Sequence, residues 1–112
     1  MMPDLARLYD DAFFAEWGNS HPAYVEGARL IANVLVDEFR PARMVDLGCG
    51  CGVYSHWLAQ RGVETVAIDG VRPPSAYSFP VDVQIQDLTV PFENRWGRFD
   101  AALCLEVAEH IP

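Results

Sequence analysis

The apolar residues change their spacing near residue 42, from the period of a helix to that of a strand. Before this point, residues 4–17 and 21–39 carry apolar side chains three and four positions apart, a spacing that predicts two helices. Pro22 suits the first turn of the second helix, and Pro41 cannot continue it. The apolar face of this second helix is predicted to include Val25, Leu30, Ile31, Val34 and Leu35.

Four short apolar runs after residue 42 are each typical of a strand. They cover residues 43–48, 63–69, 81–87 and 99–106, and the third of them alternates apolar with polar positions. Residues 52–62, between the first two runs, predict one short helix that ends at a glycine. Strand, helix and strand in this order predict a parallel pair of strands with a right-handed crossover.

The other two connections between the strands are irregular in composition. Residues 70–80 contain Pro73 and Pro74 and allow at most a turn or two of helix, which would start near these prolines. Residues 88–98 contain a proline and a glycine and predict a loop. The chain therefore departs from a regular alternation of strands and helices here.

The composition limits the classes of function that the chain can serve. Its 112 residues make at most one small domain, and 51% hydrophobic against 21% charged residues is typical of a chain that folds. The net charge of −8 disfavours nucleic acid as a partner and favours a small-molecule substrate. No apolar run is long enough to span a membrane and no signal-peptide core is present, so we expect no membrane partner and a cytoplasmic location.

Three cysteines are too few for a secreted disulfide framework, and free thiols fit a reducing compartment. Cys49 and Cys51 stand among glycines, whereas Cys104 lies in the fourth predicted strand. A metal site on two thiols needs a second pair of ligands at suitable spacing, which the chain lacks. We therefore expect Cys49 and Cys51 to be small packing residues and Cys104 to lie in the core.

The stretch MVDLGCGCGVYS, residues 44–55, predicts a glycine-rich loop between a strand and a helix. The backbone of such a loop can approach a ligand closely, with the helix amides directed at it. A P-loop is excluded because no lysine follows the glycines. A dinucleotide fingerprint fits imperfectly, since Val53 or Ser55 stands where the third glycine is required.

Asp46 lies two residues before the first glycine of the loop and sets its electrostatic character. A carboxylate at this point repels a pyrophosphate and suits a ligand that carries positive charge. S-adenosylmethionine is such a ligand, because its ammonium and sulfonium groups outnumber its carboxylate. Its ribose also requires an acidic partner, and Asp69 at the end of the second predicted strand can accept hydrogen bonds from both ribose hydroxyls.

Four motifs, in order along the chain, resemble those of the class I S-adenosylmethionine-dependent methyltransferases. VDLGCGCG at 45–52 resembles the glycine motif of this family, and VAIDG at 66–70 resembles the acidic motif that follows it. QDLTVPF at 86–92 and FDAALCLEVAEHIP at 99–112 are similar to the third-strand and fourth-strand motifs. The resemblance implies an α/β fold, a Rossmann-like three-layer sandwich after N-terminal helices, with a mostly parallel sheet in the order 3-2-1-4.

Carried over residue by residue, the resemblance implies a set of cofactor-binding residues. The methionine part of the cofactor would lie among Asp46, Gly48, Cys49, Gly50 and Gly52, the ribose at Asp69 and Gly70, the adenine at Asp87 and Leu88, and the sulfonium above Leu105 or Glu106. Simpler alternatives are a helix-capping role for Asp46 and a turn-forming role for Asp87.

The stretch LEVAEHIP resembles metal-using members of the family, among them ubiquinone-pathway O-methyltransferases and small-RNA 2'-O-methyltransferases. If a helix begins there, Glu106, Glu109 and His110 share one face. Together they could bind a divalent cation such as Mg, which would acidify a substrate hydroxyl. The alternatives are a base or structural role for His110, the one candidate catalytic residue, and a solvated helix start with favourably placed acids.

The resemblance divides the chain at residue 41. Residues 1–41 would form an N-terminal helical segment, and residues 42–112 the S-adenosylmethionine-binding part of a truncated seven-stranded fold. The apolar edge of the fourth strand would then pair in a homo-oligomer or with a missing C-terminal half.

The predicted function is methyl transfer from S-adenosylmethionine to a small-molecule or unknown acceptor, at an oxygen atom, which the 112 residues alone need not be able to catalyse. The alternative is a non-catalytic Rossmann-like module that binds a nucleotide or serves in assembly.

Overall fold

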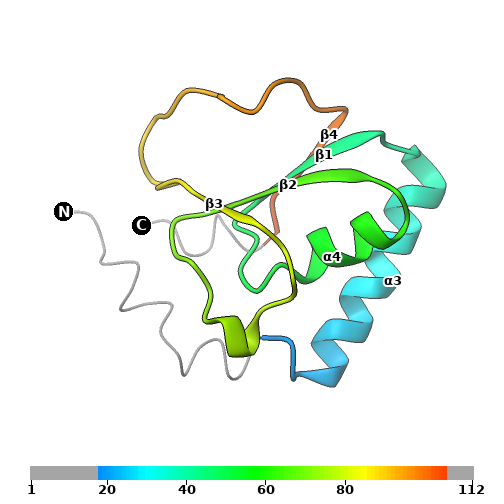
Figure 1. The fold of residues 1–112 in the computed structure, drawn as a ribbon. Coiled ribbons are helices and arrows are strands. Elements are labelled where there is room, and N and C mark those ends of the chain that lie inside the picture. Colours follow the sequence, from blue (N-terminus) through cyan, green and yellow to red (C-terminus); the bar gives the residue numbers. More distant parts are fainter. Residues whose placement is uncertain (1–17, 106–112) are drawn as a thin grey trace.

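The computed structural model describes residues 18–105 and contains one parallel sheet with two α-helices (Figure 1). The elements in chain order are α3 (Pro22–Phe39), β1 (Arg43–Leu47), α4 (Val53–Gln60), β2 (Glu64–Asp69), the short 3₁₀ helix η1 (Ser75–Tyr77), β3 (Val83–Ile85) and β4 (Ala101–Leu103). The predicted helix at residues 4–17 and the stretch from residue 106 onward lie outside the described residues.

The sheet has the order β3-β2-β1-β4, and all of its pairs are parallel. β1 lies in the interior, with Val45 opposite Val66 of β2 on one side and opposite Ala102 of β4 on the other. The predicted α/β fold class and strand order are therefore confirmed. β3 and β4 are each only three residues long, shorter than the apolar runs that predicted them.

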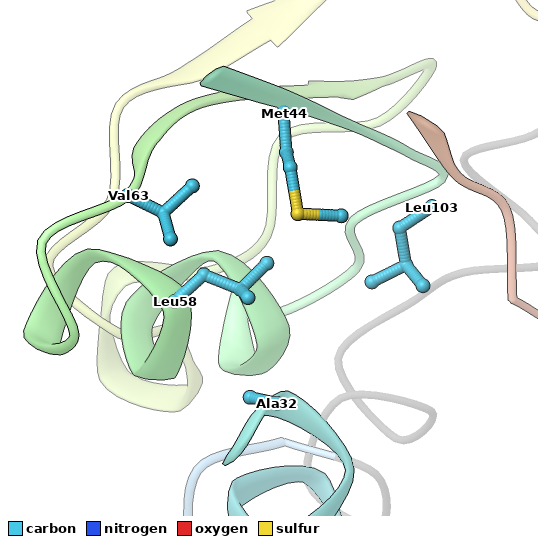
Figure 2. Packing of buried hydrophobic residues seen from close by; sticks show 5 residues of the cluster. All are labelled: Ala32, Met44, Leu58, Val63 and Leu103. Atoms are coloured by element: carbon cyan, nitrogen blue, oxygen red, sulfur yellow. The ribbon is translucent and has the colours of Figure 1, made fainter. Parts of the chain in front are cut away.

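Five buried side chains join the sheet to both helices (Figure 2). Met44 of β1 and Leu103 of β4 lie in one cluster with Leu58 of α4, Ala32 of α3 and Val63. Full burial of a side chain of the size of leucine stabilises a fold by about 1.5–3 kcal/mol. This cluster therefore fixes α3 and α4 on the same face of the sheet.

The predicted apolar face of α3 is wrong for Leu30, Ile31 and Val34, which are 53%, 44% and 58% exposed. The buried residues of α3 are Ala28 and Ala32, one turn apart. Small side chains let α3 approach α4 closely. The spacing of large apolar residues therefore does not indicate the buried face of this helix. Val25 and Leu35, also predicted on this face, are partly buried and pack beside the alanines.

Local hydrogen bonds explain where α3 begins and ends. His21 is its N-cap residue, and Nδ1 of His21 accepts a hydrogen bond from the backbone N–H of Tyr24 at 3.0 Å. At the other end Arg40 adopts a left-handed conformation and its N–H donates to the carbonyl of Val36. None of the helices in residues 18–105 is both long and apolar enough to cross a membrane.

Cys104 was expected in the core, but it is exposed. β4 ends at Leu103, whose side chain is buried against the helices. Successive residues of a strand point to opposite faces, so the residue after Leu103 points away from this core.

Candidate functional site

The predicted cofactor-binding residues meet at one edge of the sheet. Because all strands are parallel, their carboxyl ends lie side by side (Figure 1). The glycine loop, residues 48–52, follows β1, Asp69 is the last residue of β2, and Asp87 and Leu105 lie two residues past β3 and β4. The chain leaves β1 towards β2 on one side, while β4 lies on the other, so a crevice is expected at this edge between β1 and β4.

Three glycines determine the backbone conformation of the loop. Gly48, Gly50 and Gly52 have φ angles of 74°, 56° and 83°, in the left-handed region that residues with a Cβ rarely adopt. The N–H groups of Gly48 and Cys49 both donate to the carbonyl of Ile68 in β2, at 2.8 and 3.1 Å. The loop is therefore fixed to the end of β2, and its turn is available only to glycine.

Asp69 joins the end of β2 to the middle of the glycine loop. Its Oδ2 accepts a hydrogen bond from the N–H of Gly50 at 2.8 Å, and its Oδ1 accepts one from Val71 at 3.3 Å. Burial raises the pKa of Asp69, and the hydrogen bonds from backbone amides oppose part of this shift. A carboxylate that burial partly removes from water is stabilised by further hydrogen-bond donors. The two hydroxyl groups of a ribose are donors of this kind.

Asp46 lies beneath the loop, with only 4% of its surface exposed. Its Oδ2 accepts a hydrogen bond from Oγ of Ser55 at 2.9 Å. The pKa of Asp46 is raised to about 6, chiefly by burial, with the Ser55 hydrogen bond opposing the rise and the negative charge of Asp69 adding to it. Two carboxyl groups thus concentrate negative potential under the glycine loop, as a positively charged ligand requires.

Ser55 was not among the residues singled out in the sequence. It is fully buried in the first turn of α4, and its hydroxyl donates a hydrogen bond to one oxygen of Asp46. A small polar residue nine positions after the acid was the available signal, but its meaning depends on the tight turn that brings α4 back over β1.

Cys49 and Cys51 are buried free thiols, as expected of packing residues. Burial raises the pKa of both, to about 11 for Cys51, so both stay protonated at neutral pH. Within residues 18–105 no group of three or more His, Cys, Asp or Glu side chains could hold a metal ion. The predicted ligands Glu106, Glu109 and His110 lie outside the described residues.

Asp87 makes a turn after β3. Its Oδ1 accepts hydrogen bonds from the N–H of Thr89 at 2.8 Å and from Oγ1 of Thr89 at 2.6 Å. The side-chain and backbone hydrogen bonds of Thr89 lower the pKa of Asp87, so it is ionised at neutral pH. The turn-forming role is therefore present, and it places Asp87 at the same edge of the sheet as Asp69.

The connection between β2 and β3, residues 70–82, packs against the glycine loop. The N–H of Phe79 donates to the carbonyl of Cys51 at 2.9 Å, and the Phe79 ring stacks on His56 with centroids 4.6 Å apart. A Cβ placed on Gly52 would lie 3.1 Å from Cβ of Val81. These contacts join residues far apart in the sequence, and the sequence motifs contain no sign of them.

A cavity of about 420 Å³ lies beside β3 and adjoins this site through Ser55, the hydrogen-bond partner of Asp46. It is lined by Ser55, Ala59, Thr65, Val66, Pro80, Val81, Asp82, Gln84 and Trp96. None of the predicted cofactor-binding residues lines this cavity. By contrast, a Cβ placed on Gly50 would meet no atom of residues 18–105 within 4 Å, so this part of the chain leaves open space for a ligand there.

Comparison with known proteins agrees with the geometry. The chain is 36% identical over 78 residues to a ubiquinone biosynthesis O-methyltransferase of Alkalilimnicola ehrlichii, a match that covers 62% of this chain and 32% of the relative. Enzymes of the same name from Xanthomonas oryzae pv. oryzae and Pseudomonas aeruginosa are 34% and 35% identical over 63% and 62% of this chain, and the matches cover 33% and 34% of them. The chain spans about a third of the length of these curated relatives.

A family model described as a methyltransferase domain matches residues 21–112, which include α3, the whole sheet and the glycine loop. This match favours a methyltransferase over a non-catalytic nucleotide-binding or assembly module. The chain belongs to the methyltransferase-domain family, whose cofactor is S-adenosylmethionine.

Proposed function

We propose that this chain forms the S-adenosylmethionine-binding part of an enzyme that transfers a methyl group to an oxygen atom of a small molecule. The observation that carries the proposal is a pair of carboxyl groups, the buried Asp46 and the half-buried Asp69, at a glycine loop on the carboxyl edge of a parallel sheet. Such a site offers acceptors to the cofactor's ammonium and ribose hydroxyls, and it disfavours a pyrophosphate.

The residues predicted for the cofactor fit this arrangement. In the proposed complex Asp46, Gly48, Cys49, Gly50 and Gly52 surround the methionine part of the cofactor. Asp46 is buried beneath the loop and acts on the ammonium through its charge, while open space at Gly50 admits the ligand. The remaining assignments are Asp69 and Gly70 to the ribose, Asp87 and Leu88 to the adenine, and Leu105 to the floor under the sulfonium.

The chemistry of methyl transfer makes modest demands on the protein. The bound cofactor supplies an activated methyl group, which an acceptor oxygen attacks in line with the sulfur–carbon bond. The protein holds the two reactants in position and receives the acceptor's proton. His110 is the candidate for receiving this proton. In the alternative arrangement Glu106, Glu109 and His110 together would hold a divalent cation, which would acidify the acceptor hydroxyl.

The acceptor atom and the location of the enzyme are proposed from the relatives and the composition. The relatives are named O-methyltransferases, which supports an oxygen acceptor on a small molecule. The net charge of −8 works against a nucleic-acid substrate. We propose a cytoplasmic location for the same enzyme.

Calorimetric titration with S-adenosylhomocysteine, the product form of the cofactor, tests the proposal. The chain should bind it, and Asp69→Asn should weaken the affinity by about tenfold or more, because a charge-assisted hydrogen bond to the ribose is lost. Asp82→Asn is the matched control, since Asp82 is exposed and contacts Gln84 outside the site. A folded sample that gives no heat of binding at high micromolar ligand would disprove the function for this chain.

A further inference from the structure

The β2–β3 connection, residues 70–82, is held from two sides. On its inner side, the N–H of Phe79 donates to the carbonyl of Cys51 in the glycine loop at 2.9 Å, and Val81 lies against Gly52. The connection also begins directly after Asp69, the residue that accepts from the N–H of Gly50. A shift of this connection would therefore move the glycine loop with it.

On its outer side, the connection is held by Asn19. The backbone N–H of Asn19 donates to the carbonyl of Tyr77 at 3.0 Å, and Nδ2 of Asn19 donates to the carbonyl of Ser78 at 3.1 Å. One residue thus satisfies two successive carbonyls, 59 positions further along the chain in the case of Ser78. Asn19 lies just before the residues that match the family model and outside all four motifs.

The neighbouring aromatic side chains make the connection a firm link to both helices. The Phe79 ring stacks on His56 of α4 and lies 6.5 Å from the centroid of Trp57. Trp57 in turn donates to the carbonyl of Val25 in α3 at 3.2 Å. With the interior fixed in this way, the carbonyls of Tyr77 and Ser78 are the points at which Asn19 contacts the connection.

We infer that Asn19 is a positioning residue for the cofactor site. It holds the β2–β3 connection against the glycine loop and thereby keeps the N–H of Gly50 and the Asp69 carboxylate in register. The expected effect on cofactor binding rests on the proposed function. The connection from Asn19 to the glycine loop rests only on the hydrogen bonds described above.

The test compares Asn19→Asp with Asn94→Asp in the same chain. Each substitution keeps the shape of the side chain, adds one negative charge and removes a donor to a backbone carbonyl. Nδ2 of Asn94 donates to the carbonyl of Gly97 in the β3–β4 connection, remote from the glycine loop. Asn19→Ala, which adds no charge, is measured as well, because its effect must have the same direction as that of Asn19→Asp.

Two measurements are made on each variant. In hydrogen exchange, the Asn19 variants should lose about tenfold in protection at the amides of Phe79 and Gly52, while Asn94→Asp leaves both unchanged. In calorimetric titration, the Asn19 variants should bind S-adenosylhomocysteine about threefold more weakly or worse, beyond any change seen with Asn94→Asp.

Unchanged protection at Phe79 and Gly52 in both Asn19 variants would overturn the inference, whatever the ligand does. Altered protection with unchanged affinity would also overturn it, because the loop would then not depend on Asn19 for binding. If the parent chain binds no S-adenosylhomocysteine, the proposed function fails, and the exchange data still decide whether Asn19 holds the loop.

Discussion

At the residue scale, two glycines with nearly the same backbone conformation have different surroundings. Gly52 and Gly62 have φ angles of 83° and 84°, at the beginning and just past the end of α4. A Cβ on Gly52 would lie 3.1 Å from Val81, whereas a Cβ on Gly62 would meet no atom of the described residues within 4 Å. The two positions therefore separate the cost of a left-handed backbone from the cost of close packing.

We expect Gly52→Ala to reduce the free energy of unfolding more than Gly62→Ala does. Both variants force alanine into the left-handed region, at about 1–2 kcal/mol. Gly52→Ala adds a clash with Val81, for which overpacking costs of about 1–3 kcal/mol are typical. Urea unfolding of both variants measures the difference, and equal losses would mean that the Val81 contact relaxes without cost.

The buried carboxyl group of Asp46 makes stability depend on pH. Its pKa is raised from 3.8 to about 6 in the folded chain, so between these values the folded state binds more protons than the unfolded state. Stability from this group therefore falls as the pH rises from about 4 to about 6, by an amount of about 2–3 kcal/mol. The pKa of Asp69 is raised as well and acts in the same direction.

Asp46→Asn should remove this dependence. Asparagine still offers an oxygen to Oγ of Ser55 but is never charged, so the variant should be more stable than the parent at pH 8, by about 1–2 kcal/mol, and similar to it near pH 4. Urea unfolding at the two pH values provides the measurement. A parallel shift at both would show that the hydrogen bond, and not the charge, governs the effect.

The sequence predicted residues of this kind unevenly. Asp46, Asp69 and the glycines follow from a local motif, because a left-handed turn and a buried acid leave a signature within ten residues. Ser55 and Asn19 do not, since each acts through a contact that exists only once the chain has folded. Each of them matters because of the residue that it contacts, and a local sequence pattern does not predict that residue.

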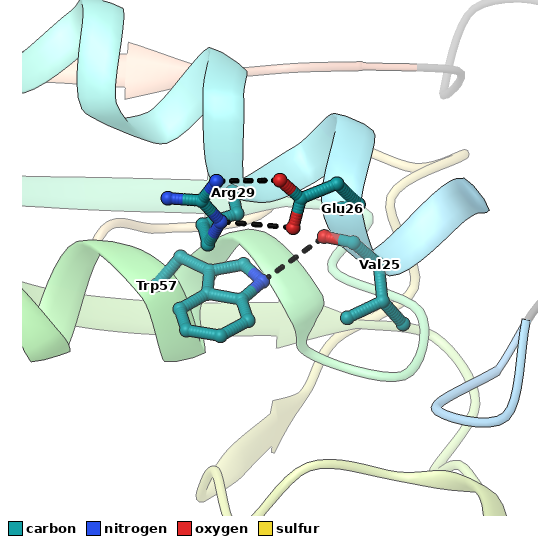
Figure 3. Close-up of polar contacts among 4 residues, drawn as sticks. All are labelled: Val25, Glu26, Arg29 and Trp57. Atoms are coloured by element: carbon teal, nitrogen blue, oxygen red, sulfur yellow. Dashed lines mark hydrogen bonds and ion pairs between the residues drawn. The ribbon is translucent and has the colours of Figure 1, made fainter. Parts of the chain in front are cut away.

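At the scale of elements, the α3–α4 pair joins the region before the sheet to the glycine loop. Figure 3 shows Trp57 of α4 with its indole nitrogen directed at the carbonyl of Val25 in α3, beside the ion pair of Arg29 and Glu26. The Trp57 contact is partly buried and joins two helices, whereas the ion pair is exposed and lies within α3. The two interactions should therefore differ in their effect on stability.

Trp57→Phe should reduce the free energy of unfolding by about 1–2 kcal/mol, since it removes the hydrogen bond and part of the ring while keeping an aromatic side chain. Glu26→Gln breaks the exposed ion pair and should leave the unfolding midpoint where it is. Thermal or urea unfolding gives both values. If the two variants lose stability equally, the indole hydrogen bond does not join the helices.

The elements themselves were well predicted where the pattern is dense. β1, α4 and β2 match the apolar runs and the glycine that follows the helix, and the two irregular connections were predicted from their prolines and glycines. The face of α3 was not, because Ala28 and Ala32 mark the contact with α4 and the larger Leu30 and Val34 are exposed. Close helix packing favours small residues at the contact, and these do not contribute to a pattern of large apolar residues.

At the scale of the whole molecule, α3 exposes large apolar side chains and β4 has an open edge. Leu30, Val34 and Phe39 of α3 are 53%, 58% and 72% exposed. α3 packs beside β4 through the core cluster of Ala32 and Leu103. Within residues 18–105, β4 pairs with β1 alone, so its outer edge carries unpaired backbone groups. The exposed apolar residues of α3 and the open strand edge of β4 are two separate features that each favour association.

We therefore expect the chain to associate with itself in a concentration-dependent manner. Val34→Lys should shift the equilibrium towards the monomer, because a charge in the middle of the exposed apolar face of α3 would have to be desolvated on association. Gln60→Lys is the control, since it adds the same charge at an exposed position of α4. Sedimentation velocity distinguishes the species. A monodisperse parent monomer would contradict the expected self-association. An equal effect of both lysines would show that net charge and not the α3 face controls association, whereas a selective effect of Val34→Lys places the contact on the exposed apolar residues of α3.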